Sequence, residues 1–215
     1  FVNWADFPSI SLNEVSGSIF SFHLQKSSEE TFSYDVNYHI NSKETWNDMN
    51  KIHDDNTFSE HGFVSSIPYK DGFMVSWLDG RNTYGVGDHG HAKGAMTIRS
   101  AVLDYNGNIV SQNVIDEMVC ECCQTSMAIS GGIPIVVYRN RSDGEIRDIY
   151  FSRYIDSNWS DPEPVHDDGW EINGCPVNGP NVDSYGDNVV VSWFSASNGR
   201  PKVNLKFSTD NGRTF

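Results

Sequence analysis

The chain has 215 residues, and its 29 acidic residues outnumber its 15 lysines and arginines, which gives a formal net charge of −14. Because so acidic a chain repels phosphate backbones and no segment concentrates basic residues, general nucleic-acid binding is excluded. Aromatic residues make up 13% of the sequence, which argues against disorder. No apolar run approaches the roughly 18 residues that a spanning helix needs, so we expect no membrane span.

Short apolar runs rich in β-branched and aromatic residues alternate with Gly, Asn, Asp and Ser turns, and helical periodicity is nearly absent. This pattern is typical of an all-β chain. Four of the runs share one character, and we expect them to be the second strands of four repeated units. They cover residues 18–24, 73–78, 133–138 and 189–194, which gives a repeat of about 56 residues.

Each of these runs is preceded by a shorter strand and a turn, and is followed by a third strand. The expected third strands cover residues 32–39, 95–103, 148–153 and 202–207. Fourth strands are expected to open at Trp46, Ile109, Trp159 and Phe215.

This repeat predicts a β-propeller of four-stranded antiparallel blades. We expect residues 1–215 to be one partial propeller domain that contains about four blades. The complete protein is expected to have six blades. The expected blades cover residues 4–58, 59–118, 119–175 and 176–215, and the last is incomplete.

The last eight residues read Ser-Thr-Asp-Asn-Gly-Arg-Thr-Phe, and a weaker copy covers residues 39–46. Asp210 can accept hydrogen bonds from backbone N–H groups of the turn, while Gly212 permits a positive φ. Phe215 is then free to pack between sheets. The octet resembles the Asp-box of the sialidase (neuraminidase) superfamily of β-propellers, also called BNR repeats. The structural residues that this resemblance implies are Ser208, Asp210, Gly212, Thr214 and Phe215.

The resemblance implies a carbohydrate-active propeller, either a sialidase-like glycoside hydrolase or a catalytically silent relative that binds a glycan or another small polar ligand. It also implies a periplasmic or extracellular location, with any signal peptide outside the given chain. In the superfamily the Asp-box is a structural hairpin away from the active site, so it predicts a fold rather than a chemistry. No catalytic residue is assigned, and whether the protein is an enzyme stays open.

Arginines occur where second strands end and third strands begin. Arg81, Arg139 and Arg141 follow second strands, and Arg147-Asp148 opens a third strand. An arginine at such a place can grip a substrate carboxylate with two hydrogen bonds. Salt bridges between blades are the alternative, and we favour them.

Asp168 and Trp170 form a second polar-aromatic candidate, in the sequence His-Asp-Asp-Gly-Trp. A carboxylate beside an indole ring could bind a sugar by hydrogen bonding and stacking. A solvated turn with Trp170 packed inward is an equal alternative.

Three segments that precede first strands carry soft metal ligands. First strands of a propeller are innermost and begin at one mouth of the channel, so we expect these ligands to converge. They are His61, Cys120, Cys122, Cys123 and Cys175. A Zn²⁺ or Cu⁺ site is one interpretation. Disulfides, with Cys175 tied to one member of the cluster, are another, and reactive thiols are the third.

The sequence Gly-Asp-His-Gly-His places His89 and His91 in a loop after a second strand. A His-x-His pair puts both rings on one side of an extended segment, as metal binding requires. A solvated loop is the alternative. These histidines and the cysteines together leave a metal- or redox-linked propeller as a second function, and a scaffold for a protein partner as a third.

Overall fold

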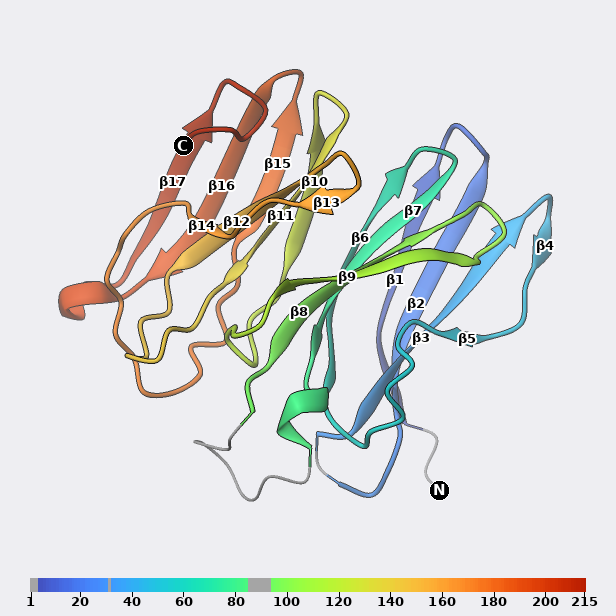
Figure 1. Cartoon of the computed structure of the whole chain (residues 1–215), viewed down its shortest axis with the longest axis horizontal. Coiled ribbons are helices and arrows are strands. Elements are labelled where there is room, and N and C mark those ends of the chain that lie inside the picture. The colour runs from blue at the N-terminus through green and yellow to red at the C-terminus, as the bar shows by residue number, and fades with distance from the viewer. Residues whose placement is uncertain (1–3, 31, 85–93) are drawn as a thin grey trace. The chain divides into compact units, whose positions relative to one another are not determined.

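The computed structural model describes residues 4–30, 32–84 and 94–215. These residues form β-strands joined by turns, with two single-turn 3₁₀ helices, η1 (Arg81–Thr83) and η2 (Ser197–Gly199) (Figure 1). Within the described ranges, no helix has the length and the apolar character needed to cross a membrane.

The strands form four antiparallel sheets, as predicted for four blades. The first sheet has the order β1 (Ala5–Asn13), β2 (Ser18–Lys26), β3 (Tyr34–Ser42) and β4 (Thr45–Trp46), and β5 (Asn50–Lys51) also pairs with β3. The second sheet has the order β6 (His61–Tyr69), β7 (Gly72–Asp79), β8 (Thr97–Leu103) and β9 (Ile109–Asp116).

The third and fourth sheets repeat this order. The third has β10 (Ser126–Ser130), β11 (Ile133–Arg139), β12 (Ile149–Ile155) and β13 (Asn158–Trp159), and β14 (Glu163–Pro164) also pairs with β12. The fourth has β15 (Asn181–Tyr185), β16 (Asn188–Ser195) and β17 (Lys202–Ser208).

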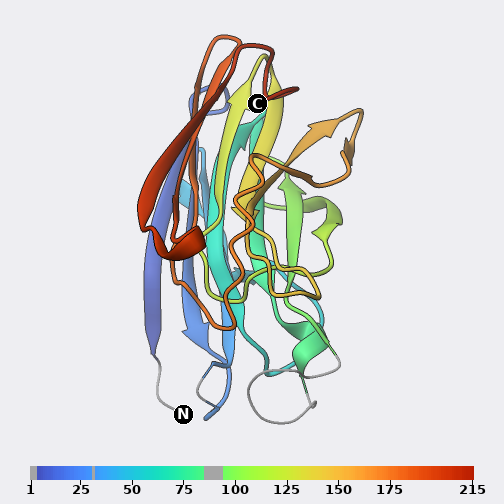
Figure 2. The same cartoon turned by 90° about the vertical axis from the view of Figure 1, so that its left-hand side faces the viewer.

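The chain divides into two compact units. The first contains Phe1–Gly62 and Ser66–Val114, and the second contains Phe63–Ser65 and Ile115–Phe215. In the second unit, the first strands of its two sheets, β10 and β15, lie side by side (Figure 1; Figure 2).

The predicted second strands are confirmed as β2, β7, β11 and β16, but the fourth strands differ from blade to blade. In the second sheet β9 is continuous, whereas in the third sheet the fourth strand is divided into β13 and β14. Pro162 lies between these two short strands, and Pro164 ends the second one. Because proline has no backbone N–H to donate, a strand through these positions loses ladder hydrogen bonds and breaks.

Alternation of buried and half-buried residues along β2 directs its aromatic side chains into the core of the first unit. Phe20 is fully buried there, with its ring centroid 5.4 Å from that of Phe73 and 5.6 Å from that of Tyr38. The Tyr38 hydroxyl donates to the carbonyl of Gly107 at 2.9 Å. The first two sheets are therefore joined by an aromatic cluster with its one polar group satisfied.

We expect Phe20→Ala to lower the free energy of unfolding of the first unit by about 3–5 kcal/mol, because it removes a buried ring and leaves a cavity. Phe7→Ala is the matched control, since Phe7 lies in β1 of the same unit and is 67% exposed. Urea denaturation followed by tryptophan fluorescence measures both variants. Equal losses in the two variants would contradict this assignment of the core.

The turn after β17 contains the octet that resembles an Asp-box. Asp210 Oδ1 accepts from the Thr214 amide at 3.0 Å and from the Ser208 hydroxyl at 2.6 Å. Gly212 has φ 70°, and a Cβ at that position would lie 2.7 Å from Ile135. The Phe215 ring packs edge-on against Phe151 with centroids 4.9 Å apart.

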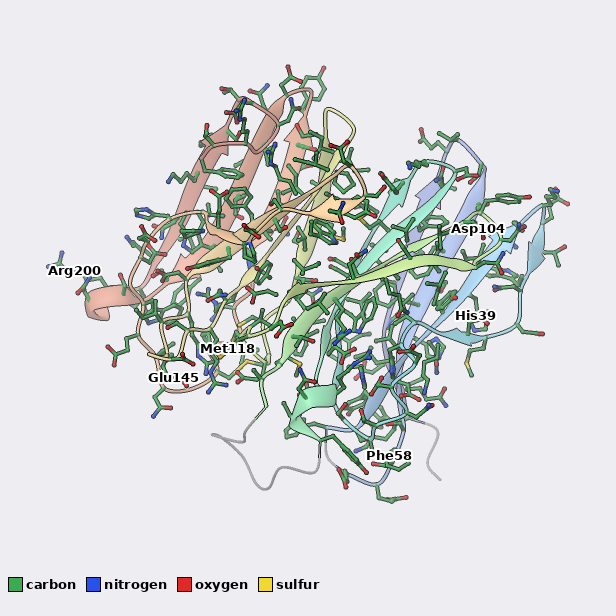
Figure 3. The ribbon with its side chains drawn as sticks, in the orientation of Figure 1. His39, Phe58, Asp104, Met118, Glu145 and Arg200 are labelled. Atoms are coloured by element: carbon green, nitrogen blue, oxygen red, sulfur yellow. A yellow bond between two sulfur atoms is a disulfide. The ribbon has the colours of Figure 1, made fainter. Side chains whose placement is uncertain are left out.

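The second blade has a related turn without a recognisable octet. Asp104 Oδ1 accepts from the amides of Asn106 and Asn108, each at 2.9 Å, and Oδ2 accepts from the Asn108 side chain at 2.8 Å. As in the turn of Asp210, the carboxylate binds the amide four residues later. This end of the first unit lies opposite the end that carries Phe58 (Figure 3).

Candidate functional site

Each unit gathers ionisable side chains at corresponding ends of its blades. The residues that carry these side chains lie just before or at the start of a first strand, at the end of a second strand, or at the start of a third strand. In the first unit His61 begins β6 and Asp79 ends β7, and in the second unit Arg139 ends β11. The Asp104 and Asp210 turns lie instead between third and fourth strands or just after the third strand, at the other strand ends.

The first unit contains a buried group that we call the histidine–aspartate cluster, defined as Asp35, His53, Asp55, His61 and Asp79. The side chains of His53, His61 and Asp79 have no exposed surface, and that of Asp55 is 5% exposed. The two imidazole rings stack with centroids 3.6 Å apart and an interplanar angle of 10°.

Asp79 is the best-satisfied carboxylate of the cluster. Its Oδ1 accepts from Arg81 Nε at 2.8 Å, and its Oδ2 accepts from Arg81 NH2 at 2.8 Å and from Trp77 Nε1 at 2.9 Å. Burial alone would raise the pKa of Asp79, but the Arg81 and Trp77 hydrogen bonds and the neighbouring His61 outweigh it and hold the pKa below its usual range. Arg81 is thus paired with a carboxylate of its own chain.

Asp55 and Asp35 lie against the two histidines. Burial favours the neutral form of Asp55, but the neighbouring His61 and the Thr57 hydroxyl outweigh it and hold the pKa of Asp55 well below the usual range. The pKa of Asp35 is also lowered, because the neighbouring His53 and Lys51 together outweigh its burial. Both groups are therefore carboxylates at neutral pH.

The second unit contains a cysteine cluster, defined as Cys120, Cys122, Cys123 and Cys175. Cys122 and Cys175 form a disulfide, whereas Cys120 and Cys123 are buried free thiols with their sulfurs 3.1 Å apart. The hydrogen bond with Cys123 lowers the pKa of Cys120 to about 6, with a further contribution from Arg147, against the opposing effect of burial. The Cys120 thiolate in turn raises the pKa of Cys123.

We expect the disulfide to contribute about 2–4 kcal/mol to the stability of the second unit, since it closes a long loop between residues 53 positions apart. A Cys122→Ser/Cys175→Ser variant should lose this amount, which differential scanning calorimetry would detect as a lower Tm. Reductant should lower the Tm of the original chain and leave that of the double variant unchanged. A reductant effect of equal size in both proteins would contradict the expected contribution.

The arginines of the second unit are committed to protein groups. Arg139 is 1% exposed and donates to the backbone carbonyls of Asn178, Arg147 and Phe194. Arg141 and Arg147 each form ion pairs with both Glu121 and Glu145. Figure 3 labels Glu145 beside Met118 at this end of the unit. These ion pairs lie within the third blade, so they differ from the salt bridges between blades that the sequence suggested, and a substrate-binding role of Arg141 and Arg147 stays a prediction.

Asp148, Asp168 and Trp170 also have partners within the second unit. Asp148 accepts from the amides of Gly169 and Trp170 at 2.8 and 3.0 Å, and Asp168 accepts from Trp193 Nε1 at 2.6 Å. The Trp170 ring is buried, and the Arg139 guanidinium lies 4.9 Å from its centroid. Their role in sugar binding stays a prediction.

The structure places His61 in the first unit among aspartates, and the cysteines in the second. His89 and His91 lie outside the described residues, so their metal binding stays a prediction. Sequence reasoning missed four members of the histidine–aspartate cluster, Asp35, His53, Asp55 and Asp79. One signal was available, because the triplet His-Asp-Asp occurs at residues 53–55 and again at 166–168, each time after the fourth-strand segment of a blade.

No family model and no curated protein matches the sequence. Among solved structures, the chain is similar to the Hadza microbial sialidase Hz136, with a TM-score of 0.58 and 12% identity over 98% of this chain and 45% of that one. It is similar to a leech intramolecular trans-sialidase, with a TM-score of 0.58 and 10% identity over 99% of this chain and 50% of that one.

A xylan β-1,4-xylosidase from Bacillus halodurans C-125 matches with a TM-score of 0.51 and 10% identity, over 99% of this chain and 42% of that one. The chain therefore spans about half the length or less of these structures. At such low identity these similarities establish the fold alone, which is a β-propeller.

Proposed function

We propose that the chain is part of a carbohydrate-active β-propeller whose sugar site lies at the blade ends of the second unit that carry the cysteine cluster. The observation that supports this is the concentration of partly buried ionisable groups with shifted pKa values at these ends, which is typical of functional sites. The opposite ends hold self-satisfied turns, such as that of Asp210. The similar structures, a sialidase, a trans-sialidase and a xylosidase, favour a glycan as the ligand.

Within this class we propose a neutral sugar rather than an acidic one. Arg81, Arg141 and Arg147 are paired with carboxylates, and Arg139 donates to backbone carbonyls. Releasing a paired arginine to bind a substrate carboxylate would leave its former partner without compensation. The net charge of −14 also repels anionic sugars.

A glycan array and a panel of fluorogenic glycosides test the proposal with the full chain. We expect binding or turnover of neutral glycans. Arg141→Gln should weaken it by about tenfold, or about 1.4 kcal/mol, because it leaves Glu121 and Glu145 at the proposed site without one of their ion-pair partners. Arg213→Gln is the matched control, since Arg213 is exposed in the turn that contains Asp210. An absence of both binding and turnover, or equal effects of the two variants, would refute the proposed site.

The disulfide between Cys122 and Cys175 supports a periplasmic or extracellular location, since such bonds persist in oxidising compartments. Expression with a signal sequence and a thiol count on the secreted protein tests this. A reduced and fully active chain in the cytosol would contradict it.

A second candidate function is a redox or thiolate-metal site at Cys120 and Cys123, favoured by two buried sulfurs 3.1 Å apart next to Arg147. Oxidation would join the two sulfurs and release two protons and two electrons, which an external disulfide would accept to become two thiols. Thiol counting in denaturant with elemental analysis distinguishes the cases. Two thiols that disappear on oxidation support the dithiol, whereas bound metal lost in Cys120→Ser supports the metal site.

A further inference from the structure

Three sulfur atoms of the cysteine cluster lie within reach of one another. The Sγ atoms of Cys120, Cys122 and Cys123 are all within 4.8 Å of each other, and Cys122 is also the disulfide partner of Cys175. The two free thiols therefore lie directly beside a disulfide bond. Thiol–disulfide exchange requires this arrangement, because a thiolate must attack one sulfur of the bond and displace the other.

The four cysteines differ in their access to solvent. Cys120 and Cys123 are each 1% exposed, whereas Cys122 is half-buried and Cys175 is exposed. An external disulfide can therefore reach Cys175 but not the two free thiols. If these thiols reduce a substrate in solution, as the second candidate function requires, their electrons must pass through the Cys122–Cys175 bond or wait for the unit to open.

Cys120 is the better placed of the two thiols to attack the disulfide. Its Sγ accepts from Arg147 NH1 at 3.3 Å, and a guanidinium at this distance stabilises a thiolate. Its amide donates to the carbonyl of Arg139 at 2.9 Å, which fixes the backbone beside the sulfur. Cys123 is adjacent to Cys122 in the sequence, and adjacent Cα atoms are closer together than a relaxed disulfide allows. Cys123 instead lies 3.1 Å from Cys120, where it can complete the exchange.

We propose that the cysteine cluster is a thiol–disulfide exchange centre in which the Cys122–Cys175 bond carries electrons from the buried thiols to an external disulfide. This inference rests on the redox form of the second candidate function. The Cys120 thiolate attacks Cys122, forms a Cys120–Cys122 bond and displaces Cys175 as a thiolate, which takes a proton from solvent. Cys123 then gives up its proton and attacks Cys120, which forms the Cys120–Cys123 bond and releases Cys122 as a thiol.

This exchange moves the disulfide and leaves the number of thiols unchanged, so it needs no oxidant. The exposed Cys175 then attacks an external disulfide and forms a mixed disulfide with one half of it, while the other half leaves as a thiol. Cys122 attacks Cys175 in this mixed disulfide, which re-forms the Cys122–Cys175 bond and releases the second half as a thiol. In sum, one external disulfide is reduced for each Cys120–Cys123 bond that forms.

Alkylation of the native full chain with iodoacetamide, followed by mass-spectrometric mapping of labels and disulfides, tests the exchange without reference to any activity on sugars. We expect the label on Cys122 and Cys175, and a disulfide between Cys120 and Cys123. Cys120→Ser removes the nucleophile, so Cys175 should stay bonded to Cys122 and unlabelled. Cys123→Ser is the matched control, because the exchange should then stop after its first step, with Cys175 labelled and Cys120 bonded to Cys122.

Dithiodipyridine, a small neutral disulfide whose reduction is followed by absorbance, tests the transfer of electrons to the surface. The native chain should reduce about one molecule of it, with loss of two thiols per chain. The Cys122→Ser/Cys175→Ser variant keeps the buried thiols without the connecting bond. It should react at least about tenfold more slowly in native buffer, since its thiols are reached only when the unit opens, and at the original rate in denaturant.

Three results would overturn the proposal. Equal rates for the original chain and the Cys122→Ser/Cys175→Ser variant in native buffer would show that an external disulfide reaches the buried thiols directly, which leaves the second candidate function intact. Labelling of Cys175 that Cys120→Ser does not slow would assign the attack to another group. A native chain that neither reacts with dithiodipyridine nor exposes a thiol at Cys175 would refute the exchange and the redox function together.

Discussion

Arg139→Met is expected to lower the free energy of unfolding of the second unit by about 3–5 kcal/mol, as when one member of a buried charged network is removed. The guanidinium is 1% exposed and binds the carbonyl oxygens of Asn178 and Phe194, which belong to different loops and strands. Methionine fills a similar volume but donates no hydrogen bond, so these carbonyls would lose their charged donor.

Thermal and urea unfolding of the second unit measure this effect, with Arg200→Met as the matched control. Arg200 is exposed in the turn that follows η2 (Figure 3), so its replacement should change stability by less than about 0.5 kcal/mol. Arg139→Lys should fall in between, because lysine keeps the charge but cannot reach the same carbonyls with a planar fork. Equal stability of Arg139→Met and Arg200→Met would show that the network contributes nothing.

Asp79→Ala is expected to cost the first unit about 3–5 kcal/mol, since it leaves the Arg81 charge without its closest partner and Trp77 Nε1 without an acceptor. Asp79→Asn should cost less, because the amide oxygen can still accept one of these hydrogen bonds while its NH₂ group faces a donor. Urea unfolding of both variants measures this effect.

Asp54→Ala is the control for this prediction. Asp54 also lies near Arg81, at 3.5 Å, but its side chain is 79% exposed. An exposed ion pair contributes little, so this variant should unfold within about 1 kcal/mol of the original chain. A loss in Asp54→Ala as large as that in Asp79→Ala would mean that burial does not govern the strength of these pairs.

The four-sheet architecture could be predicted because its signal is local. Each second strand is a short apolar run that follows a tight turn, and the position of Trp77 or Trp193 within its run is enough to align the blades. The division of the third blade's fourth strand could also have been predicted from the sequence, because Pro162 and Pro164 interrupt it. The length of β9 could not be predicted, because nothing in its sequence distinguishes it from the shorter fourth strands.

The candidate site was only partly predictable, because its members are brought together by contacts between loops. His61 was identified from its place before a first strand, but its neighbours Asp35 and Asp55 come from the start of β3 and from the segment after β5. The cysteine cluster was identified as a group, whereas its pairing was not, since Cys122 and Cys123 are adjacent and either could face Cys175. The direction of each side chain decides which of the two cysteines pairs with Cys175, and the spacing of cysteines in the sequence does not give that direction.

The Cys122–Cys175 bond also determines how the second unit can open. These cysteines lie in the segments that lead into β10 and β15, the two strands that pack side by side. The covalent bond fixes one end of this strand pair, so the third and fourth sheets can separate only by splaying from the other end, near the Asp210 turn. We therefore expect any opening of this strand pair to be smallest beside the cysteine cluster and largest at the far ends of the two strands.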